Sequence, residues 1–147
     1  MAPHDDHDHD HGHDHDHAHG HPHHHPAPPL RLQAARIYCG DLEQAVLFYR
    51  DLIGLTLLKQ AGNAAVFDTG VAQLTVEGLP HGHPAHADMV GRFTGLSFVV
   101  ADLAATYGRL SALGVTFLAP PQPQAAGGGA AHFRDTAGNV LTMIGKL

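Results

Sequence analysis

The feature that most constrains the fold of this chain is an internal repeat. Residues 131–143 are typical of a strand, a tight turn and a second strand, and residues 65–76 repeat this pattern in a weaker form. A shift of 67 positions aligns Asp68 with Asp135. One copy of such a unit cannot bury its own apolar face, so the repeat predicts one fold built from two similar modules.

Each module also contains one predicted helix. A shift of 61 positions aligns residues 41–45 with residues 102–106. Asp41 and Asp102 are predicted to cap these helices, because a carboxylate accepts hydrogen bonds from the first helical N–H groups. The expected strands are residues 32–39, 55–58, 64–67 and 72–77 in the first module, and 94–100, 115–118, 132–134 and 140–144 in the second.

Glycines and prolines mark the expected connections. Gly54 and Gly114 should end the two helices, with Leu113 packed inward on the second. Residues 79–92 are predicted to be a loop that joins the modules, and residues 120–129 a mobile connection before the last hairpin.

Three segments carry a resemblance to a known family. Residues 38–42, residues 48–55 and the turn at residues 133–139 resemble the vicinal-oxygen-chelate superfamily, which includes glyoxalase I, extradiol dioxygenases, fosfomycin-resistance enzymes and bleomycin-resistance proteins. Thr136 stands where the turn of this superfamily usually has proline. The resemblance covers about residues 31–146.

The resemblance implies a fold and an assembly. The fold would be α+β, with two βαβββ modules at about residues 31–78 and 92–146 that form one cupped mixed sheet with helices outside. The edges of such modules usually pair, so the resemblance also implies a homodimer.

Charge divides the chain into a tail, residues 1–29, and a body, residues 30–147. The tail contains no Lys or Arg and carries the whole net charge of −6, whereas the body has eight basic and eight acidic residues. This balance gives no electrostatic reason to expect binding to nucleic acid or an anionic membrane. A single cysteine, no apolar run of 18 residues and no signal-peptide pattern predict a cytoplasmic protein without a membrane span.

The tail alternates histidine and aspartate and is predicted to be disordered when free, because it has almost nothing apolar to bury. Neutral imidazole is a common ligand for zinc, nickel and copper, so we expect the tail to bind these ions. The candidate ligands are His4, His7, His9, His11, His13, His15, His17, His19, His21, His23, His24 and His25. An inert solubilising segment or a purification tag is the alternative.

The inner metal site implied by the resemblance has no suitable ligands here. In metal-dependent members of the superfamily, one ligand lies seven residues before the capping Asp of each of the two helices, and one lies seven residues after the Asp of each of the two turns. The corresponding positions are Ala34, Gly95, Thr75 and Thr142. None offers an imidazole or a carboxylate, so no inner metal is expected, and glyoxalase I and extradiol dioxygenase activities are disfavoured.

Alternation along the strands predicts which polar side chains line the cup instead. The candidate ligand-binding residues are Arg36, Tyr38, Gln73, Thr75, Glu77, Ser97, Arg134 and Thr142. Such groups suit an anionic or phenolic small molecule, and His132 is the candidate general base. Alternatively, these residues satisfy one another or water at the mouth of a pocket. Cys39 should face the helix side as a small core residue.

His81, His83 and His86 have a spacing that can bind a metal, although histidines on such a loop are more often solvated.

The sequence leaves three functional hypotheses open. The chain binds a small ligand without a metal; or it is a lyase, dioxygenase or transferase that uses His132 and Arg36 or a non-standard metal site; or it buffers or delivers transition metals through its tail.

Overall fold

The computed structural model describes Pro26 and residues 29–147 of the chain. Residues 32–147 form one compact unit. The predictions made for the histidine-rich tail fall outside the described residues. Among the residues that are described, no helix is long and apolar enough to cross a membrane.

The first module contains four strands, a helix and a π-helix. Its elements are β1 (Ala34–Cys39), α1 (Leu42–Leu47), the π-helix η1 (Phe48–Ile53), β2 (Thr56–Ala61), β3 (Ala64–Asp68) and β4 (Gln73–Gly78). The strands form a mixed sheet in the order β1-β4-β3-β2, in which β1 and β4 are parallel.

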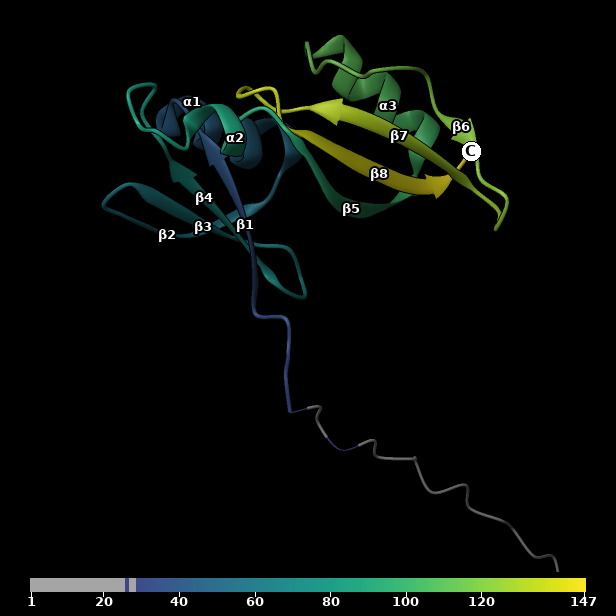
Figure 1. The fold of residues 1–147 in the computed structure, drawn as a ribbon. Coiled ribbons are helices and arrows are strands. Elements are labelled where there is room, and N and C mark those ends of the chain that lie inside the picture. Colours follow the sequence, from purple (N-terminus) through teal and green to yellow (C-terminus); the bar gives the residue numbers. More distant parts are fainter. Residues whose placement is uncertain (1–25, 27–28) are drawn as a thin grey trace, which may run out of the picture. The chain divides into compact units, whose positions relative to one another are not determined.

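The second module repeats this arrangement after a short helix. Its elements are α2 (His86–Met89), β5 (Phe93–Asp102), α3 (Leu103–Ala112), β6 (Gln122–Pro123), β7 (Gly129–Arg134) and β8 (Val140–Lys146). Its sheet has the order β5-β8-β7-β6, with β5 parallel to β8. The predicted α+β fold of two βαβββ modules is therefore confirmed. The single cupped sheet that was expected is instead two four-stranded hydrogen-bonded sheets, one in each module (Figure 1).

Both helices begin at the predicted caps. The side chain of Asp41 accepts a hydrogen bond from the backbone N–H of Gln44, and that of Asp102 accepts one from Ala105. The first helical segment ends at Gly54, whose φ of 88° lies in the left-handed region that glycine tolerates best.

The helices cover one face of each sheet, and aromatic rings connect the two modules. Ile37 and Cys39 of β1 are buried on the covered face, as the alternation predicts. Phe48 on η1 stacks on Phe133 of β7, with 6.4 Å between ring centroids. Phe48 also meets Tyr49 edge-on. The modules thus share part of one core.

Two predictions for the segment between α3 and β7 are wrong. Residues 115–118 do not form a strand, because only Phe117 makes a β-bridge, to Phe133, before the chain reaches two prolines that cannot donate backbone hydrogen bonds. Within residues 120–129, expected to be a mobile connection, β6 pairs with the start of β7.

Three further boundaries differ from expectation. Leu113 is 54% exposed rather than inward, because α3 ends at Ala112. The first strand begins at Ala34 instead of Leu32, which is exposed. The loop expected at residues 79–92 contains α2, so His86 lies at the start of a short helix.

Candidate functional site

The open face of the first sheet displays the predicted polar residues of β1 and β4. In the parallel register Arg36 lies beside Thr75 and Tyr38 beside Glu77, so these side chains share the face opposite Ile37. An Arg36 guanidinium N–H donates to the Glu77 carboxylate at 2.5 Å. Gln73, also predicted, lies beside Ala34 at the start of the row.

The open face of the second sheet carries a row of three predicted residues on neighbouring strands. Thr142 of β8 lies between Ser97 of β5 and His132 of β7. Nδ1 of His132 and Oγ1 of Thr142 are 2.7 Å apart, a hydrogen bond that orients the imidazole ring. Phe93 meets the ring edge-on, with centroids 6.0 Å apart. Sequence reasoning missed Phe93, because its proximity depends on the pairing of β5 with β8.

Arg134 lies near this row, but part of its guanidinium is used by the adjacent turn. Its NH1 group donates to the backbone carbonyl of Gly138 at 3.0 Å. Among the described residues, no side-chain hydrogen bond or ion pair joins the predicted ligand-binding residues of one sheet to those of the other. Arg36 and Glu77 form one contact group, and His132 and Thr142 form the other.

The side chains at the four inner metal positions do not fit a metal. Thr75 and Thr142 are only 8% and 7% exposed, and the hydroxyl of Thr142 is already hydrogen-bonded to His132. Ala34 and Gly95 have no side-chain donor at all. In the part of the chain that the structure describes, no three His, Cys, Asp or Glu residues are grouped so that they could hold a metal ion.

The aspartate of the last turn is a structural centre that connects the modules. Tyr49 donates to Oδ2 of Asp135 at 2.7 Å, and the backbone N–H of Asn139 donates to Oδ1 at 2.9 Å. The Asn139 amide also donates to the backbone carbonyl of Tyr38 at 2.7 Å. Burial, followed by the charge of Asp135 and the hydrogen bond to it, raises the pKa of Tyr49 above its usual range. Tyr49 therefore remains a hydrogen-bond donor.

Cys39 is fully buried behind the same junction. Burial is the main cause, with the charges of Asp135 and Asp41, that raises the pKa of the thiol to about 11. The thiolate is the reactive form of cysteine, so this side chain is a core residue and not a nucleophile, as the alternation along β1 predicts.

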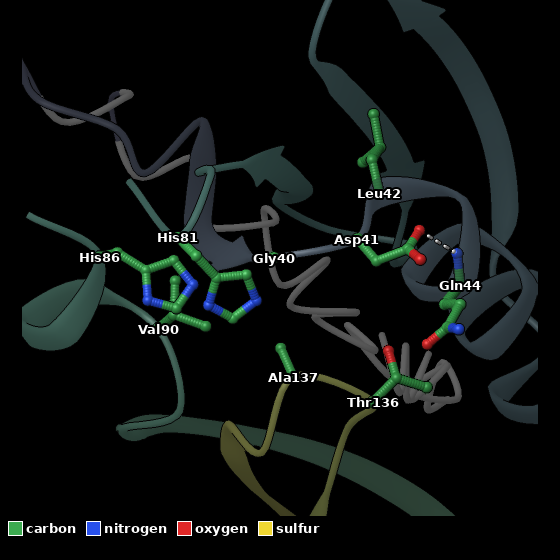
Figure 2. A pocket seen from close by; sticks show the side chains of 9 residues that line it. All are labelled: Gly40, Asp41, Leu42, Gln44, His81, His86, Val90, Thr136 and Ala137. Atoms are coloured by element: carbon green, nitrogen blue, oxygen red, sulfur yellow. Dashed lines mark hydrogen bonds between the residues drawn. The ribbon is translucent and has the colours of Figure 1, made fainter. Parts of the chain in front are cut away.

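A cavity of about 620 Å³ lies at the junction of the modules, and His81 and His86 both line it (Figure 2). The residues that line it are Gly40, Asp41, Leu42, Gln44, His81, His86, Val90, Thr136 and Ala137. The rings of His81 and His86 are 4.3 Å apart between centroids. His83 does not join them, because its Nδ1 accepts a hydrogen bond from the backbone of Ala85. Spacing alone flagged all three histidines and could not separate His83 from the pair.

Comparisons with known proteins agree with this architecture. The family model described as Glyoxalase/Bleomycin resistance protein/Dioxygenase superfamily matches residues 31–143. A solved structure of a member of that superfamily from Sphaerobacter thermophilus is similar to this chain, with 26% identity, a TM-score of 0.66 and coverage of 80% of this chain and 98% of the other.

Two further solved structures have the same fold. One, named lactoylglutathione lyase, from Agrobacterium tumefaciens, is 25% identical, with a TM-score of 0.63 and coverage of 81% of this chain and 96% of the other. Another, from Nocardioides, is 21% identical, with a TM-score of 0.66 and coverage of 83% and 87%. A search of curated proteins gave no match.

Proposed function

The chain belongs to the glyoxalase/bleomycin resistance protein/dioxygenase superfamily, and from that membership we propose that it binds a small phenolic or anionic molecule on the open faces of its sheets, without the inner metal of the superfamily. The observation that supports this most is the pairing of donor and acceptor groups on those faces. Arg36 is paired with Glu77, and His132 is paired with Thr142.

The ion pair favours a phenol over a simple anion. Because the Glu77 carboxylate offsets the charge of Arg36, an anion gains attraction from one group and repulsion from the other. A phenol hydroxyl can accept from a guanidinium and donate to a carboxylate. On the second sheet, the hydrogen bond at Nδ1 leaves Nε2 of His132 as the nitrogen available to a ligand.

The proposal is tested with two probes of similar size. 4-Nitrophenol, followed by its absorbance, and benzoate, followed by competition, are titrated into the full chain below the pKa of the nitrophenol. We expect saturable binding of 4-nitrophenol and weaker binding of benzoate. Failure of both probes to bind at millimolar concentration would contradict the proposal.

An enzyme is the second candidate, favoured by the hydrogen bond that orients His132. A histidine held by Nδ1 in one orientation is suited to act as a general base through Nε2. This enzyme would be a lyase, dioxygenase or transferase that uses His132 with Arg36 or a non-standard metal site. We expect no lactoylglutathione lyase activity with added Zn²⁺ or Ni²⁺. If the wild-type protein turns over a substrate and His132→Gln does not, the protein is an enzyme and not only a binding protein.

We further propose two properties that belong to the rest of the chain. The tail binds Zn²⁺, Ni²⁺ or Cu²⁺, and a role in buffering or delivering these metals is the alternative function. The protein is also proposed to be a homodimer through the pairing of module edges that the family resemblance implies, and β5, which carries the 79% exposed Val99, is an edge strand of the second sheet. Light scattering at micromolar concentration should give twice the mass of one chain.

A further inference from the structure

We propose that His81 and His86 form a binding site for one divalent transition-metal cation at the junction of the modules, separate from the open sheet faces and from the tail. The metal would be of the class that prefers imidazole nitrogen, namely Zn²⁺, Ni²⁺ or Cu²⁺. The geometry, the burial and the charge of the cavity each support this site.

The two imidazoles point at the same small space. A Cβ atom added to Gly40 would lie 3.3 Å from Nε2 of His81 and 3.5 Å from Nε2 of His86. The ring centroids are 4.3 Å apart and the planes differ by 34°. Two zinc–nitrogen bonds of about 2.0–2.1 Å hold their nitrogens within about 4 Å of each other, and both Nε2 atoms border the space beside Gly40. The absence of a side chain at Gly40 leaves the space open.

One of these nitrogens lacks a partner. Nε2 of His86 is buried and has no hydrogen bond to any described residue. Buried polar atoms are nearly always satisfied, so an orphaned imidazole nitrogen that borders a cavity requires a ligand or water. A cation bound by a neutral imidazole satisfies it directly.

The charge of the cavity selects a cation over an anion. Asp41 contributes a carboxylate, and none of the described residues that line the cavity is Lys or Arg. One oxygen of the Asp41 carboxylate accepts from the backbone N–H of Gln44, and the carboxylate points toward Gln44 rather than toward the imidazoles, so Asp41 adds negative charge to the cavity lining without being a ligand (Figure 2). With two protein nitrogens, the site would keep open coordination positions for water or for donor atoms of a ligand.

The test uses the full chain with the twelve tail histidines replaced by asparagine, so that tail binding does not mask the site. Zn²⁺ is titrated by calorimetry, and Cu²⁺ is examined by electron paramagnetic resonance. We expect one equivalent of Zn²⁺ and a copper signal with coupling to imidazole nitrogen. A chain of this kind that binds no Zn²⁺ and no Cu²⁺ would overturn the proposal.

Single variants in the same background locate the site. His81→Ala and His86→Ala should each abolish the one-equivalent binding, whereas His83→Ala should retain it, because His83 lies in the same segment but does not line the cavity. Gly40→Ala should weaken binding by about tenfold or more, as loss of precise ligand placement does at other metal sites. His81 is exposed, so its variant remains informative if His86→Ala is unstable without metal. Equal binding by all four variants, or equal loss with His83→Ala, would refute the assignment.

Discussion

Tyr49 and Asp135 are 86 positions apart in the sequence, yet the Tyr49 phenol donates to the Asp135 carboxylate at 2.7 Å in the buried junction between the modules. Asn139, from the same turn, accepts from the backbone N–H of Gly91 and donates to the backbone of β1. The turn that carries the family resemblance therefore joins the two modules. The Asp135 carboxylate accepts hydrogen bonds from Tyr49 and from its own turn, so a structural role is enough to account for this residue.

Tyr49→Phe should destabilise the protein without changing its fold. The substitution leaves a buried carboxylate without one of its donors, which costs about 1–3 kcal/mol in the free energy of unfolding. Urea unfolding at pH 7 measures the loss. Tyr107→Phe is the matched control, because Tyr107 is only partly buried on α3 and meets Phe117 through its ring. Equal stability of Tyr49→Phe and wild type would contradict a structural role for this hydrogen bond.

The two helix caps could be predicted from the sequence because they depend on local chemistry. Asp41 and Asp102 cap helices within one turn of themselves, so their neighbours in sequence were enough to identify them. The single bridge of Phe117 and the two-residue strand β6 depend on how the chain meets β7, which no local pattern encodes.

The internal repeat led to one wrong alignment between the two modules. Sequence matching aligned Asp68 with Asp135, but Asp68 pairs with Gln73 at the end of β3, as Arg134 pairs with Val140 at the end of β7. The second turn is therefore one residue longer. That additional residue lets Asp135 turn inward to the junction, whereas Asp68 is exposed and accepts from the backbone of Gly70. For the candidate site, alternation along the strands could predict which side chains share an open face, whereas the contact of Phe93 with His132 and the meeting of His81 with His86 depend on contacts between distant segments and could not be predicted.

Alkaline pH should destabilise the fold through Cys39. Burial raises the pKa of this thiol from 9.0 to about 11, so between these values the unfolded chain releases the proton while the folded chain retains it. The contribution of the Cys39 thiol to the free energy of unfolding is therefore complete below pH 9. It is lost between pH 9 and pH 11, by roughly 2–3 kcal/mol if the whole pKa shift is expressed. The raised pKa of Tyr49 acts in the same direction at higher pH.

Unfolding free energies of wild type and Cys39→Ala at pH 8 and pH 10.5 isolate the thiol contribution. The decline with pH should be smaller in Cys39→Ala, whatever cost the substitution has at pH 8. Parallel curves would show that the thiol ionises equally in both states and would contradict the raised pKa.

The tail should bind metal without supporting the fold. We expect the full chain to bind more than one equivalent of Zn²⁺ or Ni²⁺, with a sharp loss below pH 6, because protons compete for imidazole near its reference pKa of about 6.5. Deletion of residues 1–29 should leave the thermal midpoint almost unchanged, since the segment has little apolar surface to bury. A fall of more than about 8 °C, roughly 1–2 kcal/mol for this size, would show that the tail packs on the body.

Arg36 provides the sharpest test of ligand binding on the open sheet faces. Arg36→Met removes the guanidinium and should weaken 4-nitrophenol by about 1.5–3 kcal/mol, roughly 10–150-fold, if a charge-assisted hydrogen bond to the phenol is lost. The control is Arg50→Met, because Arg50 is also an exposed arginine paired with a carboxylate, that of Asp51 on η1. It should bind the probe as wild type does.

His132→Gln distinguishes the two sheet faces in the same titration. If one ligand contacts both faces, Arg36→Met and His132→Gln each weaken binding, and the double variant shows a coupling energy between them. If the ligand occupies only the second sheet, His132→Gln alone weakens it, and Arg36 merely neutralises Glu77. Binding that is unchanged in both variants, but reduced in Arg50→Met, would place the ligand on the helical side of the protein and refute a site on the open faces.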